Sequence, residues 1–278
     1  MEHSMVHHSK EIFEKVHETR PLVHHITNSV TVNDCANITL CFGASPVMAH
    51  AHEEVADMVT LSNALVLNIG TLDAYQVESM HIAAEAAEER GIPIILDPVG
   101  AGATPYRTRV AQELISRFPI AIIKGNVGEI ATLAGVDATV RGVDAGAFFG
   151  DPRLAARDLA AREETVVAIT GEIDIIADAN QMILVKNGAK EMGGISGTGC
   201  MAASLIGACA AVTPDYLAAT TTALCAFGIA GEYSLGDGPY GRSAMGVYGP
   251  SSYKQRLFDN LATLTSKMLE KEGKIENL

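Results

Sequence analysis

The sequence has no tryptophan, and aromatic residues make up only 5% of its 278 residues. Proteins that stack the bases of single-stranded nucleic acid need aromatic rings, so this scarcity argues against that kind of binding. Basic residues are also few: 20 Lys and Arg stand against 33 Asp and Glu, a formal net charge of −13. Such a chain has no overall positive field to attract nucleic acid or an anionic membrane surface. We therefore expect neither partner, and a nucleotide would have to be held by local donors and a metal ion.

The first 20 residues lack the apolar core of a secretory signal or of a membrane span. The five cysteines include no C-x-x-C pair, which is typical of reduced thiols in a cytoplasm. No set of histidines and cysteines has the spacing of a zinc site. The sequence therefore predicts a soluble cytoplasmic protein without a transition-metal site.

Hydrophobic residues make up 48% of the chain, which is enough for a sizeable core. Short apolar runs rich in β-branched residues alternate with longer stretches of helical periodicity, the pattern of a parallel sheet with helices on both faces. The predicted buried strands are 64–69, 93–97, 120–124 and 165–170. The predicted helices are 73–90, 106–117, 126–134 and 152–162, and Gly91 and Gly135 are expected to end two of them.

The pattern changes after residue 170. Residues 174–177 and 182–185 predict a hairpin at the edge of the sheet. The chain after Cys200 predicts helices over 217–232 and 251–270, with a glycine-rich loop at 236–249. Since the sequence contains no linker, repeat or low-complexity tract, we expect one α/β domain over residues 1–278 with a mostly parallel central sheet.

The most informative segment is the glycine-rich run 193–200, which continues directly into small residues of helical character. Glycines let the backbone approach a ligand, and the start of the following helix presents unpaired N–H groups and a partial positive charge. The run is neither a Walker phosphate loop nor a dinucleotide fingerprint. It predicts an anion site at Gly197, Gly199 and Cys200. The alternative is an ordinary strand-to-helix turn that ends in a buried cysteine.

Side chains suited to phosphate chemistry follow the predicted strands, in segments 68–71, 97–102, 124–126 and 170–172. The carboxyl ends of parallel strands meet at one edge of a sheet, so these segments should converge with the glycine-rich turn. Asp97 and Glu129 are hard oxygen ligands suited to Mg²⁺, and Lys124 can neutralise phosphate charge. The alternatives are a helix-capping role for Asp97 and a solvated first-turn position for Glu129.

The tetrad Gly197-Thr198-Gly199-Cys200 resembles the anion-hole motif of ribokinase-like kinases, which usually carry an aspartate base as its last residue. Four further segments make the resemblance specific to the hydroxyethylthiazole kinases. These segments are His25-Ile26-Thr27-Asn28-Ser29-Val30, Gly43-Ala44-Ser45-Pro46-Val47-Met48, Asp97-Pro98-Val99-Gly100-Ala101-Gly102-Ala103, and Gly125-Asn126 with Gly128-Glu129-Ile130 and Leu133-Ala134-Gly135. The resemblance runs from about Val23 to about Gly249.

This resemblance implies a ribokinase-like fold and a homotrimer with active sites at the subunit interfaces. It also implies phosphorylation of 4-methyl-5-(2-hydroxyethyl)thiazole by ATP and Mg²⁺ in thiamine salvage. The residues at the matching positions are Asn28, Met48 and Gly197 for substrate, Lys124 and Thr170 for ATP, Asp97 and Glu129 for the metal, and Gly197, Gly199 and Cys200 for catalysis.

Cys200 would lie near the hydroxyl that receives the phosphate. A helix N-terminus lowers the pKa of a thiol, yet a thiol is a poor base for an alcohol, so we expect Cys200 to position the hydroxyl more than to deprotonate it. Three other functions stay open. The first is a hydroxymethylpyrimidine kinase, which shares the tetrad but not the segment around Asn28. The second is a thiol hydrolase, which would need a histidine partner for Cys200, and no histidine follows His81 in the sequence. The third is a nucleotide-binding regulator, which would bind ATP but show no turnover.

Overall fold

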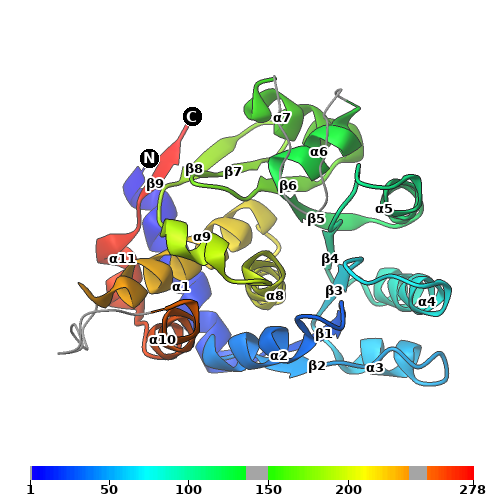
Figure 1. Ribbon diagram of the computed structural model, residues 1–278, viewed down its shortest axis with the longest axis horizontal. Coiled ribbons are helices and arrows are strands. Elements are labelled where there is room, and N and C mark those ends of the chain that lie inside the picture. The colour runs from blue at the N-terminus through cyan, green and yellow to red at the C-terminus, as the bar shows by residue number, and fades with distance from the viewer. Residues whose placement is uncertain (1, 136–149, 238–248) are drawn as a thin grey trace.

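The computed structural model describes residues 2–135, 150–237 and 249–278, which form one nine-stranded sheet in the order β2-β1-β3-β4-β5-β6-β7-β8-β9 (Figure 1). The pairs from β2 to β6 are parallel, and those from β6 to β9 are antiparallel. The strands are β1 (Leu22–Ile26), β2 (Ser45–Val47), β3 (Ala64–Asn68), β4 (Ile94–Asp97), β5 (Ile120–Gly125), β6 (Val166–Ile169), β7 (Asp174–Ala177), β8 (Met182–Val185) and β9 (Ile275–Asn277).

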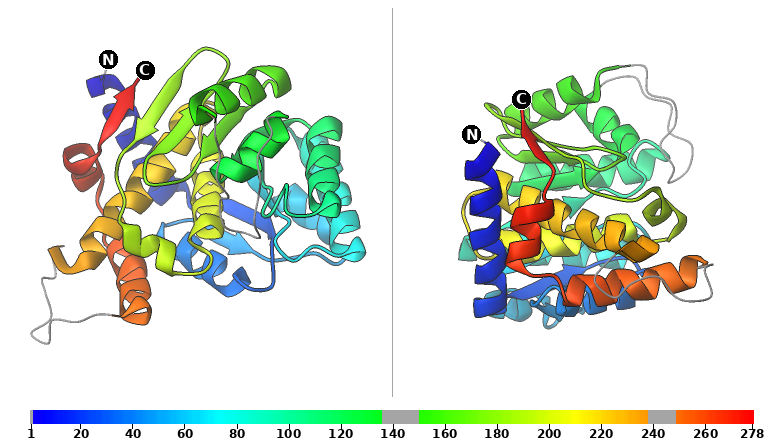
Figure 2. Two further views of the ribbon diagram at one scale, coloured as in Figure 1. Left: turned by 45° about the horizontal axis from the view of Figure 1, so that its top comes forward. Right: turned by 90° about the vertical axis from the view of Figure 1, so that its left-hand side faces the viewer.

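Helices cover both faces of this sheet, which curls around α8 and α9 (Figure 1). The helices α3 to α7 lie on the outer face, while α1, α2, α10 and α11 complete the inner layer. The helices are α1 (Glu2–Thr19), α2 (Val32–Cys41), α3 (Val55–Leu61), α4 (Ala74–Arg90), α5 (Pro105–Arg117), α6 (Val127–Ala134), α7 (Pro152–Glu163), α8 (Thr198–Ala210), α9 (Tyr216–Glu232), α10 (Pro250–Ala262) and α11 (Ser266–Glu272). Figure 2 shows the two chain ends close together, with β9 beside α1.

Alternation along the strands divides the core between the two faces. In β3, Val66 packs under α8, whereas Leu65 and Leu67 pack under the outer helices. Helix α8 approaches the sheet closely at Gly207, where an added Cβ would lie 2.7 Å from Val66 Cγ2 and 3.1 Å from Val23 Cγ1. A larger residue would push the helix away, so glycine sets the depth at which α8 is seated.

The predicted strands and the helices between them are confirmed within one or two residues. Gly91 and Gly135 end α4 and α6 with φ values of 65° and 80°, the left-handed conformation that glycine adopts readily. The hairpin is β7 and β8, but its predicted position at the sheet edge is wrong, because β9 pairs with β8 beyond it.

The predicted helix 251–270 is also wrong as a single element. α10 ends at Ala262, and Thr265 caps the start of α11, where its side-chain hydroxyl accepts a hydrogen bond from Met268 N. The predicted glycine-rich loop falls mostly on residues 238–248, which lie outside the described residues. Strands β1, β2 and β9 and helices α1, α2 and α3 were not predicted.

Candidate active site

A chain of polar side chains crosses the carboxyl ends of three neighbouring strands. Asn68 ends β3 in register with Asp97 at the end of β4, and Asn28 follows β1. Asn28 Nδ2 donates a hydrogen bond to Asn68 Oδ1 at 3.0 Å, and Asn68 Nδ2 donates to Asp97 Oδ2 at 2.5 Å. All three side chains are buried. Their mutual hydrogen bonds fix the orientation of the Asp97 carboxylate.

The glycine-rich turn forms the start of α8 beside this chain. Gly197 has a φ of +93°, and an added Cβ would lie 2.4 Å from Thr31 Cγ2, so both backbone and space require glycine. Among the described residues, no side chain caps the start of α8. The first backbone hydrogen bond of the helix runs from Met201 N to Gly197 O at 2.8 Å. The N–H groups of Thr198, Gly199 and Cys200 therefore remain available to an anion.

Cys200 lies in the first turn of α8 and contacts both asparagines. Its Sγ accepts hydrogen bonds from Asn28 Nδ2 at 3.3 Å and from Asn68 Nδ2 at 3.2 Å. Burial, together with the negative charge of Asp97, raises the pKa of the thiol. The expected lowering of this pKa by the helix N-terminus is thus outweighed, because desolvation and a like charge both disfavour the thiolate. At neutral pH Cys200 is a thiol.

Lys124 ends β5 and forms a buried ion pair with Asp97, with 3.3 Å between Nζ and Oδ1. Burial opposes the charge on the ammonium group, but the carboxylates of Asp97 and Glu129 raise the pKa of Lys124, so the lysine stays charged. An added Cβ at Gly199 would lie 3.0 Å from Nζ. The lysine therefore places its charge against the open start of α8, where a phosphate would bind.

Glu129 is buried rather than solvated, which contradicts one of the alternatives drawn from the sequence. Its Oε2 accepts a hydrogen bond from Asn126 N at 2.7 Å in a capping box, and its Oε1 accepts one from Gly100 N at 2.7 Å. Burial and the charge of Asp97 raise the pKa of Glu129, and burial raises that of Asp97. Two buried carboxylates face one ammonium group, so the site has an excess of negative charge that favours a further cation.

Thr170 follows β6 and lines a pocket of about 840 Å³ that also reaches Thr198 and Gly199. Leu224 and Phe227 of α9 give the same pocket an apolar wall. Thr170 is held in place by its backbone N–H, which donates to Gly125 O at 2.9 Å. A pocket with an anion-binding end and an apolar side has the general character of a nucleotide site.

The structure places the sequence-predicted residues in two groups along one edge of the sheet. Asn28, Asp97, Lys124 and Cys200 form one contacting set, with Gly197, Gly199 and Glu129 beside it. Thr170 lies in the pocket next to Gly199, and Met48 follows the edge strand β2, half-buried.

Asn68 was expected at this edge of the sheet only as part of segment 68–71, without a role of its own, and Thr31 was not predicted. Asn68 could have been noticed as a buried amide at the end of an apolar strand, whereas the contact between Thr31 and Gly197 depends on how α2 and α8 pack.

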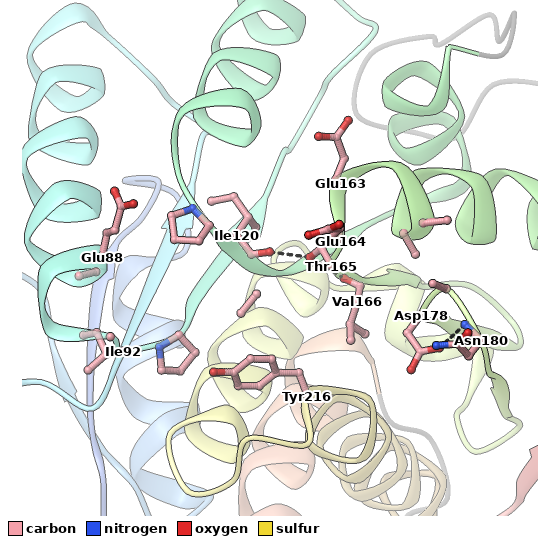
Figure 3. Close-up of a pocket in the computed structure, with 18 residues that line it drawn as sticks. Glu88, Ile92, Ile120, Glu163, Glu164, Thr165, Val166, Asp178, Asn180 and Tyr216 are labelled. Carbon is pink, nitrogen blue, oxygen red and sulfur yellow. Dashed lines mark hydrogen bonds between the residues drawn. The ribbon is translucent and has the colours of Figure 1, made fainter.

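A second pocket, of about 760 Å³, opens at the amino ends of β5 and β6 (Figure 3). Ile120, Thr165 and Tyr216 line it together with the acids Glu88 and Glu164. It includes none of the residues of the candidate active site. Within the described ranges, no three or more His, Cys, Asp or Glu side chains are grouped to hold a metal, and no helix has the length and apolarity to span a membrane.

Comparison with known proteins agrees with this geometry. Residues 13–267 match the hydroxyethylthiazole kinase family. The chain is 54% identical to the hydroxyethylthiazole kinase of Methanocella arvoryzae, over 92% of each chain, and 53% identical to that of Methanocorpusculum labreanum, over 95% of this chain and 97% of the relative.

Solved structures give the same result. A hydroxyethylthiazole kinase protein from Pyrococcus horikoshii is 40% identical, with a TM-score of 0.86 over 97% of this chain and 98% of that chain. A ribokinase-like superfamily protein from Enterococcus faecalis is only 14% identical but has a TM-score of 0.57, over 92% of this chain and 95% of that chain, and so shares the fold. The predicted fold and enzyme class are confirmed: the chain belongs to the hydroxyethylthiazole kinase family, a family of transferases with the ribokinase-like fold.

Proposed function

We propose that this kinase transfers the γ-phosphate of ATP, with Mg²⁺, to the primary hydroxyl of 4-methyl-5-(2-hydroxyethyl)thiazole, which gives the thiazole phosphate used to make thiamine. The observation that carries the proposal is the uncapped start of α8 beside the buried pair of Lys124 and Asp97. Phosphoryl transfer needs mainly positioning and neutralisation of charge, and this arrangement supplies both. Membership of the family supports the choice of substrate.

The backbone N–H groups at Gly199 and Cys200 would hold the oxygens of the transferring phosphate, and Lys124 would balance their charge. The rest of ATP would occupy the pocket of about 840 Å³, with Thr170 near the phosphates and Phe227 beside the base. The nucleotide thus extends from the start of α8 toward α9.

Asp97 and Glu129 fit a magnesium ion, because they are buried oxygen donors whose pKa values are raised by burial, and a bound cation would stabilise their charged forms. Magnesium commonly takes only one or two carboxylates from the protein and completes its shell with waters and phosphate oxygens. When bound, it would neutralise charge on the polyphosphate. Hydrogen bonds from Gly100 N and Asn126 N fix the position of the Glu129 carboxylate, which would bind the ion directly or through a water.

The thiazole alcohol would lie against Asn28, Met48 and Gly197, with its hydroxyl at Cys200. Asn28 and Asn68 fix the position of the thiol, and its raised pKa keeps it protonated. A protonated thiol is no general base, so Cys200 would orient the hydroxyl toward the phosphate. Orientation alone can contribute substantially to the rate of such a transfer.

This function is favoured over the alternatives drawn from the sequence. A thiol hydrolase needs a thiolate and a partner base, whereas the Cys200 thiol is protonated and its hydrogen-bond donors in the described chain are asparagines. The five cysteines are free, in keeping with the proposed cytoplasmic location. We further propose a homotrimer in which a neighbouring subunit completes the thiazole site.

A coupled assay of ADP release tests the proposal, with the thiazole alcohol, a hydroxymethylpyrimidine and a sugar alcohol offered in parallel. We expect turnover with the thiazole alcohol that stops when Mg²⁺ is chelated. Faster turnover with the pyrimidine would assign the chain a different substrate. ATP binding without turnover of any alcohol would indicate a nucleotide-binding regulator.

A further inference from the structure

The turn between β6 and β7 brings a carboxylate into the pocket beside Thr170. Asp174, the first residue of β7, is half-buried and lines this pocket together with Gly171 and Glu172. Its Oδ1 accepts a hydrogen bond from Gly171 N at 3.0 Å. Its Oδ2 has no hydrogen-bond partner among the described residues. The turn therefore uses one oxygen of Asp174 and leaves the other to the pocket.

The position of Asp174 along the pocket can be read from its neighbours. Thr170 and Gly199 mark the end at the start of α8, and Leu224 and Phe227 mark the apolar wall. Burial raises the pKa of Asp174 to about 7, while the N–H of Gly171 and the charge of Lys124 oppose that rise. Asp174 is thus within electrostatic reach of the lysine at the phosphate end, but it is not paired with it.

A carboxylate in a nucleotide pocket must face a hydrogen-bond donor, since it would repel phosphate oxygens. In a nucleotide that extends from the start of α8 toward Phe227, the sugar lies between the phosphates and the base. Its hydroxyl groups are donors, and carboxylates bind ribose hydroxyls in other nucleotide sites. Of the other charged side chains that line the pocket, Glu172 and Lys190 are exposed, and Glu191 is half-buried like Asp174.

We propose that Asp174 accepts a hydrogen bond from a ribose hydroxyl of the bound nucleotide and makes the pocket select ribonucleotides over deoxyribonucleotides. This inference rests on the proposed function, because it assumes that ATP occupies the pocket. Asp174 is then a specificity-determining residue of the nucleotide site, with no part in the transfer itself.

The test compares the wild-type protein with Asp174→Asn, in which the amide oxygen still accepts from Gly171 N but the charge is lost. Asp178→Asn is the matched control. Asp178 lies in the turn just after β7 and accepts hydrogen bonds from Asn180 N and Gln181 N at 2.7 Å, but it lines the pocket of Figure 3 instead. Titration calorimetry with Mg²⁺ at about pH 8.5, where Asp174 with its pKa of about 7 is ionised, would give the Kd of ATP, 2′-deoxy-ATP and 3′-deoxy-ATP for each protein. Thermal melting would show that each protein is folded.

We expect the wild-type protein and Asp178→Asn to bind at least one deoxy analogue about tenfold more weakly than ATP, the size of effect expected for one hydrogen bond to a charged acceptor. In Asp174→Asn that ratio should fall to about twofold or less, with a raised KM for ATP and little change in kcat. The deoxy analogue that binds more weakly than ATP identifies which ribose hydroxyl, 2′ or 3′, donates to Asp174.

Equal binding of all three nucleotides by the wild-type protein would overturn the inference, and so would an unchanged ratio in Asp174→Asn. A shift in the Mg²⁺ requirement of Asp174→Asn at a constant ratio would also overturn it, because the carboxylate would then serve the metal. Turnover of the thiazole alcohol is scored separately. Turnover with ATP but no discrimination between sugars refutes only this inference, whereas absence of turnover refutes the proposed function.

Discussion

At the scale of single residues, Cys200 is the least expected member of the site, because ribokinase-like sugar kinases usually have an aspartate base at the matching position. Two amide donors fix the position of its sulfur, while burial and the negative charge of Asp97 raise its pKa and keep it a neutral thiol. Under the proposed function, the site would hold the hydroxyl in place without a strong base at this position. A carboxylate there would supply the missing base.

We predict that Cys200→Asp raises kcat by several-fold or more, since a well-placed general base contributes roughly 10²–10⁴-fold and the neighbourhood of Asp97 will offset part of that gain. Cys200→Ala should lower kcat without abolishing it, because the start of α8 and Lys124 remain. Steady-state turnover at saturating Mg-ATP and thiazole alcohol measures both. Cys209→Ala, a buried thiol of the same helix, is the control. Complete loss of activity in both Cys200 variants would mean that the thiol performs covalent chemistry.

Glu129 joins two functions that a single variant can separate. In Glu129→Gln the amide oxygen can still accept the hydrogen bond from Gly100 N, but the amide NH2 group cannot accept the one from Asn126 N. The variant also removes the negative charge that is proposed to hold magnesium. We predict that the Mg²⁺ concentration for half-maximal activity rises by about tenfold or more, with a lower kcat. The surface variant Glu113→Gln should leave both unchanged. If Glu129→Gln melted at a lower temperature yet needed no more Mg²⁺, the glutamate would be a structural cap only.

The residue types of the site could be predicted from the sequence, because glycines before a helix and acids after strands have a direct chemical meaning. The contacts among them could not. The bond from Asn68 to Asp97 depends on the register of β3 with β4, and the burial that raises the pKa of Cys200 depends on how α2 and α8 pack. Asp174 looked like the start of a hairpin strand, and only the folded turn shows that it lines the pocket and accepts a hydrogen bond from Gly171 N on one oxygen.

At the scale of elements, the sequence predicted those strands whose residues are apolar on both faces, as buried parallel strands should be. It failed at β1, where two buried histidines interrupt the apolar pattern, and at β2, which has only three residues and contains a proline. Strand β9 is equally short and is defined by its pairing with β8 rather than by its own composition. Short edge strands depend on their partners, so local patterns do not reveal them.

Helix α8 is the element that connects the core to the site, and Gly207 sets its distance from the sheet. In Gly207→Val, the new side chain would enter space occupied by Val66 and Val23, and we predict a loss of roughly 3 kcal/mol in the free energy of unfolding, at the upper end for overpacking. Denaturant unfolding measures this loss. Ala161→Val, at an exposed position of α7, should cost less than about 1 kcal/mol. Equal stability of the two variants would show that α8 can shift without cost.

At the scale of the whole molecule, one end of the sheet is left uncovered at β2, whose three residues are all only partly buried. Large apolar side chains are exposed on the segments next to it: Val30 before α2 is 67% exposed, Leu40 in α2 57% and Leu61 at the end of α3 68%. Met48, expected to contact the thiazole, follows the same strand. Exposed apolar residues near a substrate site are typical of a surface that another subunit covers.

We predict a trimer with about three times the chain mass of 29.2 kDa, formed by heterologous contacts that use two different faces of each subunit. Adding charge with the double variant Val30→Glu and Leu40→Glu should dissociate it and raise the KM for the thiazole alcohol more than the KM for ATP, because only the thiazole site would lose its neighbour. Leu154→Glu, on the outer helix α7 and 58% exposed, should change neither mass nor KM. Light scattering and steady-state kinetics on the same samples provide the measurement. A wild-type monomer that phosphorylates the thiazole at full rate would show that one chain holds the complete site, and the exposed side chains around β2 would then need no partner.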